Sequence, residues 1–169
     1  TPAPVKTPSR VSPPVLPCSF GDLSWAPLLF ILLSFQLALP SAVRAQRLTE
    51  FLALNANDIS DEDGTHQGWI EIWNPSLTAV LTLTGYKISS NPPSPGVATI
   101  WTIPTIQIMP DERIIVWASG KNRSIVTAPL HTSFTLPSGA GSTLSLLNNS
   151  NAVVSSLGNY PAQTTDVSW

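Results

Sequence analysis

The acidic run that ends at Gly64 is the densest group of side chains in this chain that could do chemistry. It contains Asp58, Asp61, Glu62 and Asp63. Calcium is bound by about six to eight oxygen atoms from carboxylates, carbonyls and water, and a short acidic loop that ends in glycine can supply several of them. Asp58, Asp61 and Asp63 are therefore candidate calcium ligands. Calcium is the one cofactor that the sequence suggests.

The same run also fits an ordinary solvated turn, which is the interpretation that we favour. Its spacing lacks the alternating ligands and the distal glutamate of an EF-hand loop. Aspartate forms hydrogen bonds to the nearby backbone in turns, and glycine permits a positive φ. A turn of this kind predicts little stabilisation by calcium. It also predicts a cost of no more than about 1 kcal/mol for Asp61→Ala, the value of one lost hydrogen bond.

The remaining polar residues do not form a motif for catalysis. His66 and His131 are too few for a structural zinc site without a cysteine beside them, and we expect His131 to be packed and hydrogen-bonded rather than a base. No Gly-x-Ser-x-Gly nucleophile motif is present. Glu71 shares a strand face with Trp69 and Trp73 and is expected to be partly buried, but no motif supplies the second carboxylate of a glycosidase. The sequence therefore predicts no catalytic residue and no enzyme.

Strand-like runs separated by turn residues must position these side chains. Such runs recur at short intervals, which is typical of a β-sandwich. We expect strands at 47–54, 68–74, 80–89, 99–103, 105–109, 112–118, 130–135, 143–147 and 152–157, the last two joined as a hairpin. Nothing predicts a long helix. The fold class is therefore all-β.

Two of these runs carry finer information. The apolar positions in 80–89 change phase at Gly85, which predicts a bulge or a sharp bend there. The apolar run at 114–117 is continuous rather than alternating, which predicts a central strand covered on both faces. Most of the tryptophans are expected in the core, and any exposed one could stack on a sugar ring or anchor a protein interface.

The first 45 residues are not expected to belong to this domain. We expect residues 1–22 to form a proline-rich, disordered leader. We expect residues 23–45 to form a signal peptide, because the apolar core is shorter than the roughly 20 residues of a spanning helix and fits the roughly 7–15 of a signal core. Small residues around Ala45 predict cleavage before Gln46. The alternative is an uncleaved membrane anchor at 23–43.

The predicted domain at 46–169 is acidic and has no cysteine. It carries five basic and nine acidic residues, a net charge of 5 − 9 = −4. A surface without a basic stripe disfavours nucleic acid as a partner. Cys18 precedes the predicted cleavage site, so the exported part would be held together by its core rather than by disulfides. Because the chain begins without methionine and ends directly after a strand-like run, we expect it to be part of a larger product.

Several segments in the right order resemble the lamin-tail domain, the immunoglobulin-like β-sandwich of nuclear lamins and of many secreted bacterial proteins. These segments are residues 48–57, 61–64, 69–75, 118–123, 130–139 and 160–169. The chain has no coiled-coil rod, basic nuclear-targeting run or C-terminal prenylation motif, so the nuclear partners of lamins are not implied.

The resemblance implies a lamin-tail type of immunoglobulin-like sandwich and a non-catalytic role. The protein is then a structural, adhesive or protein-interaction module of a larger exported bacterial protein. It would be secreted, periplasmic or at the cell surface, and its partners would be other domains of the same chain or a cell-surface protein or glycan. The alternative is an N-terminal accessory domain of a secreted hydrolase or carbohydrate-active protein, with the catalytic part beyond residue 169.

Overall fold

The structure, a computed structural model, describes residues 46–91 and 99–169. Its strands are β1 (Arg47–Leu52), β2 (Gly68–Trp73), β3 (Leu81–Thr82), β4 (Lys87–Asn91), β5 (Thr99–Thr102), β6 (Gln107–Ile108), β7 (Arg113–Ala118), β8 (Leu130–His131), β9 (Ser142–Leu147) and β10 (Val153–Tyr160). The part described contains no helix, so the expected all-β class is confirmed. Among these residues there is no helix that could cross a bilayer. The predicted leader at 1–22 and the signal or anchor segment at 23–45 lie outside the described residues.

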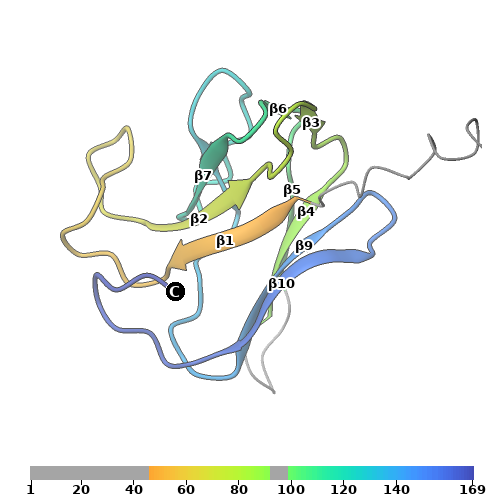
Figure 1. Cartoon of the computed structure of the whole chain (residues 1–169). Helices are drawn as coiled ribbons and strands as arrows, with labels where there is room; N and C mark the ends of the chain where they lie inside the picture. Colours follow the sequence, from red (N-terminus) through yellow and green to blue (C-terminus); the bar gives the residue numbers. More distant parts are fainter. Residues whose placement is uncertain (1–45, 92–98) are drawn as a thin grey trace, which may run out of the picture. The chain divides into compact units, whose positions relative to one another are not determined.

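The strands form two four-stranded sheets in a sandwich-like arrangement. One sheet has the order β1-β2-β7-β8 and the other β10-β9-β4-β5, while β3 and β6 form a separate two-stranded ribbon. Figure 1 shows β1, β2 and β7 side by side in one layer, with β9 and β10 in the other. All pairings are antiparallel except that of β7 with β8. The expected hairpin is confirmed, because β9 pairs with β10 across residues 148–151.

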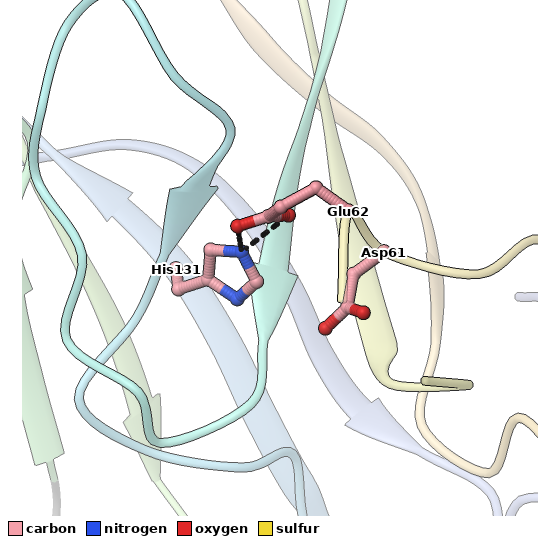
Figure 2. A group of neighbouring side chains, drawn as sticks. All are labelled: Asp61, Glu62 and His131. Atoms are coloured by element: carbon pink, nitrogen blue, oxygen red, sulfur yellow. Dashed lines mark hydrogen bonds and ion pairs between the residues drawn. The ribbon is translucent and has the colours of Figure 1, made fainter. Parts of the chain in front are cut away.

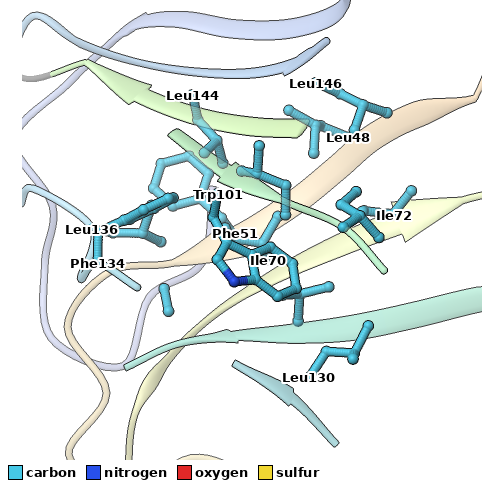
Figure 3. Close-up of a cluster of buried hydrophobic side chains, with 14 of the residues drawn as sticks. Leu48, Phe51, Ile70, Ile72, Trp101, Leu130, Phe134, Leu136, Leu144 and Leu146 are labelled. Atoms are coloured by element: carbon cyan, nitrogen blue, oxygen red, sulfur yellow. The ribbon is translucent and has the colours of Figure 1, made fainter. Parts of the chain in front are cut away.

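The core lies between the two sheets and follows from the period-2 pattern of the strands. Ile70 and Ile72 alternate along β2, Leu144 and Leu146 alternate along β9, and all four are fully buried. Figure 3 shows these side chains meeting between the sheets around Phe51 of β1. The hydrophobic burial needed to hold a disulfide-free domain is therefore concentrated between the sheets.

A smaller apolar cluster contains Leu52, Trp69 and Trp117. Val116 belongs to the main core while its neighbour Trp117 belongs to this second cluster, and both are buried. Strand β7 also lies between β2 and β8. The prediction of a central strand covered on both faces is therefore confirmed. Trp101 is buried as well, in agreement with the expectation that most tryptophans are in the core.

The expected strand at 80–89 is wrong, because the chain turns at Gly85 and enters a different sheet. Strand β3 pairs with β6, whereas β4 pairs with β5 and β9. Gly85 has a φ of 72°, which an L side chain rarely adopts. The phase change in the sequence thus marks a sharp turn between two strands and not a bulge within one.

The strand expected at 130–135 is also shorter than predicted. Strand β8 ends at His131, and the hydroxyl of Thr132 then donates a hydrogen bond of 2.5 Å to the carbonyl of Phe134. This local bond competes with the ladder of a regular strand. Beyond it, pairing with the segment after β7 continues through the hydrogen bond from the backbone of Gly120 to the carbonyl of Phe134 at 3.2 Å and the isolated bridge between Ser119 and Thr135.

The segment at the end of the chain covers the free edge of β1. The backbone N–H of Trp169 donates to the carbonyl of Phe51 at 2.9 Å, and that of Phe51 donates to Trp169 at 3.0 Å. The Trp169 ring also contacts the rings of Phe51 and Tyr160. An unpaired edge strand is a template for aggregation, and this pairing protects part of it.

Candidate functional site

The acidic run lies in the long connection between β1 and β2 and forms the expected turn. The backbone N–H of Gly64 donates to the carbonyl of Asp61, and the N–H of Asp61 donates to Thr65, both at 2.9 Å. Gly64 has a φ of 74°, the conformation that its place at the end of the run predicts. The turn presents three consecutive acidic side chains to the connection that follows β7.

Asp61 is not solvated, contrary to the expectation for an ordinary turn. Its carboxylate is fully buried and forms an ion pair with the amino group of Lys121. It also accepts hydrogen bonds from the backbone of Asp63 at 3.1 Å and from the backbone and hydroxyl of Thr65 at 2.9 Å. Burial by itself raises the pKa of Asp61, but the bonds from Lys121 and Thr65 outweigh it and hold the pKa well below its usual range.

The two neighbouring carboxylates are paired with basic side chains as well. Asp63 lies 2.7 Å from the amino group of Lys121 and 2.7 Å from the guanidinium of Arg123. Arg123 lies 2.5 Å from Glu62. Hydrogen bonds from Arg123 and Lys121 lower the pKa of Asp63, and donating hydrogen bonds to the carboxylates raises the pKa of both bases.

His131 completes this cluster. It is fully buried, and its Nε2 lies 2.9 and 3.0 Å from the two carboxylate oxygens of Glu62. Its Nδ1 lies 2.8 Å from the hydroxyl oxygen of Ser119. The prediction that His131 is packed and hydrogen-bonded is confirmed. We call Asp61, Glu62, Asp63, Lys121, Arg123 and His131 together the polar clasp.

The hydrogen-bonded series Ser119–His131–Glu62 has the residue types of a nucleophilic triad but not its geometry. In the serine hydrolase triad the hydroxyl faces Nε2 and the carboxylate faces Nδ1. Here the two nitrogens are exchanged, and Ser119 Oγ also accepts a hydrogen bond of 3.2 Å from the backbone of Lys121. If the Ser119 hydroxyl donates to Nδ1, the imidazole proton lies on Nε2 and is donated to Glu62. In that case Glu62 and Ser119 together hold the imidazole in one tautomer.

Asp61, Glu62 and His131 also have the donor types of a metal site. One ligand atom of each lies within 4.8 Å of the others, and Figure 2 shows the Glu62 oxygens facing the His131 nitrogen with the Asp61 carboxylate nearby. However, Lys121 is already bound to Asp61 and Arg123 to Glu62. A metal ion at this place would have to displace or repel two side-chain cations, so these residues fit a bound metal poorly.

The structure brings together only two of the three predicted calcium ligands. Asp61 and Asp63 both bind Lys121, whereas the carboxylate of Asp58 accepts a hydrogen bond of 3.2 Å from the indole of Trp69. Calcium binding stays the less favoured of the two interpretations of the acidic run. The contacts of Lys121, Arg123 and Ser119 with the acidic run were not predicted from the sequence. The available signal was that two of the domain's five basic residues lie in one turn after the central strand.

Glu71 is partly buried, as predicted. Its side chain is 17% exposed, lies 3.4 Å from Nε of Arg113, and accepts a hydrogen bond of 2.5 Å from Thr49. The Arg113 guanidinium also lies over the Trp73 ring at 4.7 Å. Strand register places Glu50 opposite Glu71. The position of this second carboxylate was not predicted from the sequence, and it accepts a hydrogen bond from Ser168.

Comparison with known proteins does not assign the chain to a family. No protein-family model matches the chain, and no curated protein matches its sequence.

Proposed function

We propose that this protein is a non-catalytic, exported module of the lamin-tail type with an immunoglobulin-like sandwich. It serves as a structural, adhesive or protein-interaction domain within a larger exported bacterial protein. The two-sheet, disulfide-free fold and the order of the segments that resemble lamin tails support this assignment. The protected edge of β1 suits a domain that stays folded outside the cell without a disulfide.

The observation that carries the non-catalytic role is the mutual pairing within the polar clasp. A general base or nucleophile must keep a group available to the substrate. In the clasp each carboxylate contacts a base, and the two imidazole nitrogens of His131 contact Glu62 and Ser119. These contacts join the connection after β1 to the connection after β7. We infer that the clasp positions two loops and does not act on a substrate.

The test of this role is a search for acyl transfer that depends on Ser119. Purified protein, Ser119→Ala and the exposed control Ser124→Ala are assayed with activated esters and peptide amides. We expect equal rates for all three, at the level of the buffer. Turnover in the wild type and in Ser124→Ala that disappears in Ser119→Ala would show that the Ser119–His131–Glu62 chain is a catalytic triad.

Export is tested separately by expressing the full chain in a bacterium and sequencing the N-terminus of the product. We expect the extracytoplasmic protein to begin at Gln46, because the short apolar core and the small residues before it fit a signal peptidase site. A membrane-bound product that retains residues 23–43 would instead support the anchor.

A further inference from the structure

Residues 161–169, which we call the C-terminal strap, lie on the surface of the domain and finish beside the end of β1 (Figure 1). Every strap residue is exposed except Gln163 and Ser168, which are half-buried. Tyr160, just before the strap, is instead fully buried, and its hydroxyl donates to the carbonyl of Pro137 at 2.9 Å. The core therefore fixes the chain as far as Tyr160, and the strap is held by contacts at the surface.

The groove that receives the strap is formed by main-chain groups at the free edge of β1 and in the connection that follows it. Trp169 and Phe51 exchange two main-chain hydrogen bonds, and the N–H of Asp166 donates to the carbonyl of Leu54 at 2.8 Å. A reciprocal pair of this kind is the bonding pattern of antiparallel strands. The strap is therefore bound like an extended peptide that adds to the edge of a sheet, with main-chain bonds supplying the attachment.

A site for a carboxylate gives this groove its first element of specificity. Oδ1 of Asp166 accepts hydrogen bonds from the backbone N–H of Ala56 at 2.6 Å and from that of Asn57 at 3.0 Å, and Oδ2 accepts one from the Asn57 side chain at 2.9 Å. Hydrogen bonds to an ionised acceptor are roughly twice as strong as neutral ones. A neutral side chain at this position would lose that gain, so the groove selects an acidic residue.

Ser168 and Trp169 complete the pattern that the groove recognises. The Ser168 hydroxyl donates to Glu50 at 2.5 Å. The Trp169 ring centroid lies 5.8 Å from that of Phe51 and 6.0 Å from that of Tyr160, and both of these residues are fully buried. Because Trp169 itself is 43% exposed, we expect removal of the strap to uncover the two core rings. The groove therefore suits an extended chain with the pattern Asp-x-Ser-Trp.

We infer that this groove is a peptide-docking site that accepts residues 166–169 of a second copy of the chain. The strap itself identifies the occupant, because it carries the complementary side chains and fills the groove within one copy. Exchange of straps between two copies would restore every contact described above, and exchange of an identical element is a low-cost route to association. The inference rests on the proposed role as a protein-interaction module and names the partner.

Within one copy the strap competes at an effective concentration of about millimolar, so the exchanged form should be a minor one in dilute solution. Disulfide trapping in the full chain detects such a form. All variants carry Cys18→Ser, which removes the only native cysteine. One protein carries Glu50→Cys and the other Ser168→Cys, and the two are mixed natively or refolded together from urea. A disulfide between these positions then requires the strap of one copy to lie on β1 of the other.

We expect this mixed disulfide to accumulate under oxidation, several-fold above a matched mixture of Glu50→Cys with Ser150→Cys. Ser150 is an exposed serine in the turn between β9 and β10. The positive control is one chain that carries both Glu50→Cys and Ser168→Cys, because its own strap brings the two cysteines together.

A labelled peptide of residues 161–169 tests the groove itself by fluorescence anisotropy. Asp166→Ala weakens the strap in the protein but leaves the groove unchanged, so it should bind the peptide about tenfold or more tightly than the wild type does, the factor for charge-assisted hydrogen bonds. Thr164→Ala, at an exposed strap position, should match the wild type. A peptide with alanine in place of Asp166 should bind the Asp166→Ala protein at least about tenfold more weakly than the native peptide does.

Three results would overturn the inference: a mixed disulfide no more abundant than with Ser150→Cys, a double variant that does not close, or equal affinity of the native and alanine peptides. If Asp166→Ala does not fold, the disulfide mixture decides the question. The esterase comparison with Ser119→Ala and the sequencing of the exported N-terminus do not involve this groove. Failure of strap exchange would therefore leave the non-catalytic exported role intact, and failure of either of those tests would not affect the groove.

Discussion

The environment of Asp61 shows whether the acidic run is a ligand site or a structural one. An ionised carboxylate that is fully buried is costly unless it is paired and hydrogen-bonded. Lys121 supplies the charge, and Thr65 and the backbone of Asp63 supply the hydrogen bonds. The oxygen atoms that calcium would need are therefore already used by groups of the protein itself.

Acid should destabilise the protein partly through Asp61. Its pKa is lower in the folded protein than in the unfolded chain, where it is about 3.9. Its stabilising contribution is therefore fully present above the unfolded pKa, and is lost as the pH falls from about 4 toward the folded value. We expect urea unfolding at pH 7, 4 and 3 to show a smaller loss of stability for Asp61→Asn than for the wild type. Identical profiles would mean that Asp61 is not paired in solution.

Glu62 and Asp63 contribute in the same direction, so the Asp61→Asn protein should still lose some stability in acid. Burial by itself raises the pKa of Glu62, but hydrogen bonds from its own backbone N–H, His131 and Arg123 outweigh it and lower that pKa. Hydrogen bonds from Arg123 and Lys121 lower the pKa of Asp63. The slope that remains after Asp61 is removed therefore reports Glu62 and Asp63 together with Asp166, whose pKa is lowered by hydrogen bonds from Ala56 and Asn57.

Calcium should have little specific effect on stability. A calcium site that is saturated at a hundredfold excess over its Kd would add about 2.7 kcal/mol. With the carboxylates already paired to Lys121 and Arg123, we expect the melting temperature in calcium to match that in magnesium at equal ionic strength. A rise of several degrees in calcium alone, absent in Asp61→Ala, would identify a calcium site and contradict the pairing.

At the residue scale the sequence predicted the turn but not its partners. Aspartate and glycine report their preference for turns locally, so Gly64 and its positive φ could be foreseen. Lys121 lies 60 positions from Asp61, and nothing in one sequence specifies which loops meet in space. The burial of Asp61 depends on that meeting, which is why a solvated residue was expected.

At the scale of elements, the turn at Gly85 carries the chain from the ribbon of β3 and β6 into the sheet that contains β4. It has a φ of 72°, and an added Cβ would lie 3.2 Å from the Cβ of Asn149. We expect Gly85→Ala to cost about 1–3 kcal/mol of unfolding free energy because a non-glycine residue in this region is strained. The control is Gly139→Ala, where an added Cβ meets nothing within 4 Å. Equal urea midpoints for the two variants would rule out a strained turn at Gly85.

Substitution of Trp117 tests the central position of β7 in its sheet. It is 7% exposed and packs with Leu52 and Trp69 in the second apolar cluster. We expect Trp117→Ala to cost about 3–5 kcal/mol in urea unfolding, the range for a large aromatic side chain removed from a packed interior. Trp73→Ala, at a half-buried position on β2, should cost less. A loss below about 1 kcal/mol for Trp117→Ala would place its side chain at the surface.

Most of the strands could be predicted, and the exceptions share a physical cause. Alternation and continuous apolar runs are local, so β2, β7 and β9 were found within one or two residues. The split at Gly85 and the short parallel pairing of β8 with β7 depend on which sheet each segment joins. Tertiary contacts decide such choices, and a single sequence does not report them.

At the scale of the whole domain, two sets of long-range contacts help to hold together a domain that has no cysteine. The segment ending at Trp169 covers β1, and the polar clasp fastens residues 53–67 to the connection after β7. A connection of this length without strands of its own is uncommon in a compact domain. The clasp explains how it stays ordered. The sandwich class could be predicted from the sequence, whereas these long-range contacts could not.

The central claim is that the charges of the polar clasp serve one another rather than a ligand. A double-mutant cycle between Asp61→Ala and Lys121→Ala, measured by urea unfolding without added metal, tests it most directly. We expect Asp61→Ala alone to cost about 2–3 kcal/mol, more than the value of about 1 kcal/mol that a solvated turn predicts, because it removes a buried, charge-assisted hydrogen-bond network. The coupling energy between the two sites should be at least about 1 kcal/mol. Additivity within about 0.3–0.5 kcal/mol would show that the two residues do not interact in solution, and would contradict the account of a structural clasp.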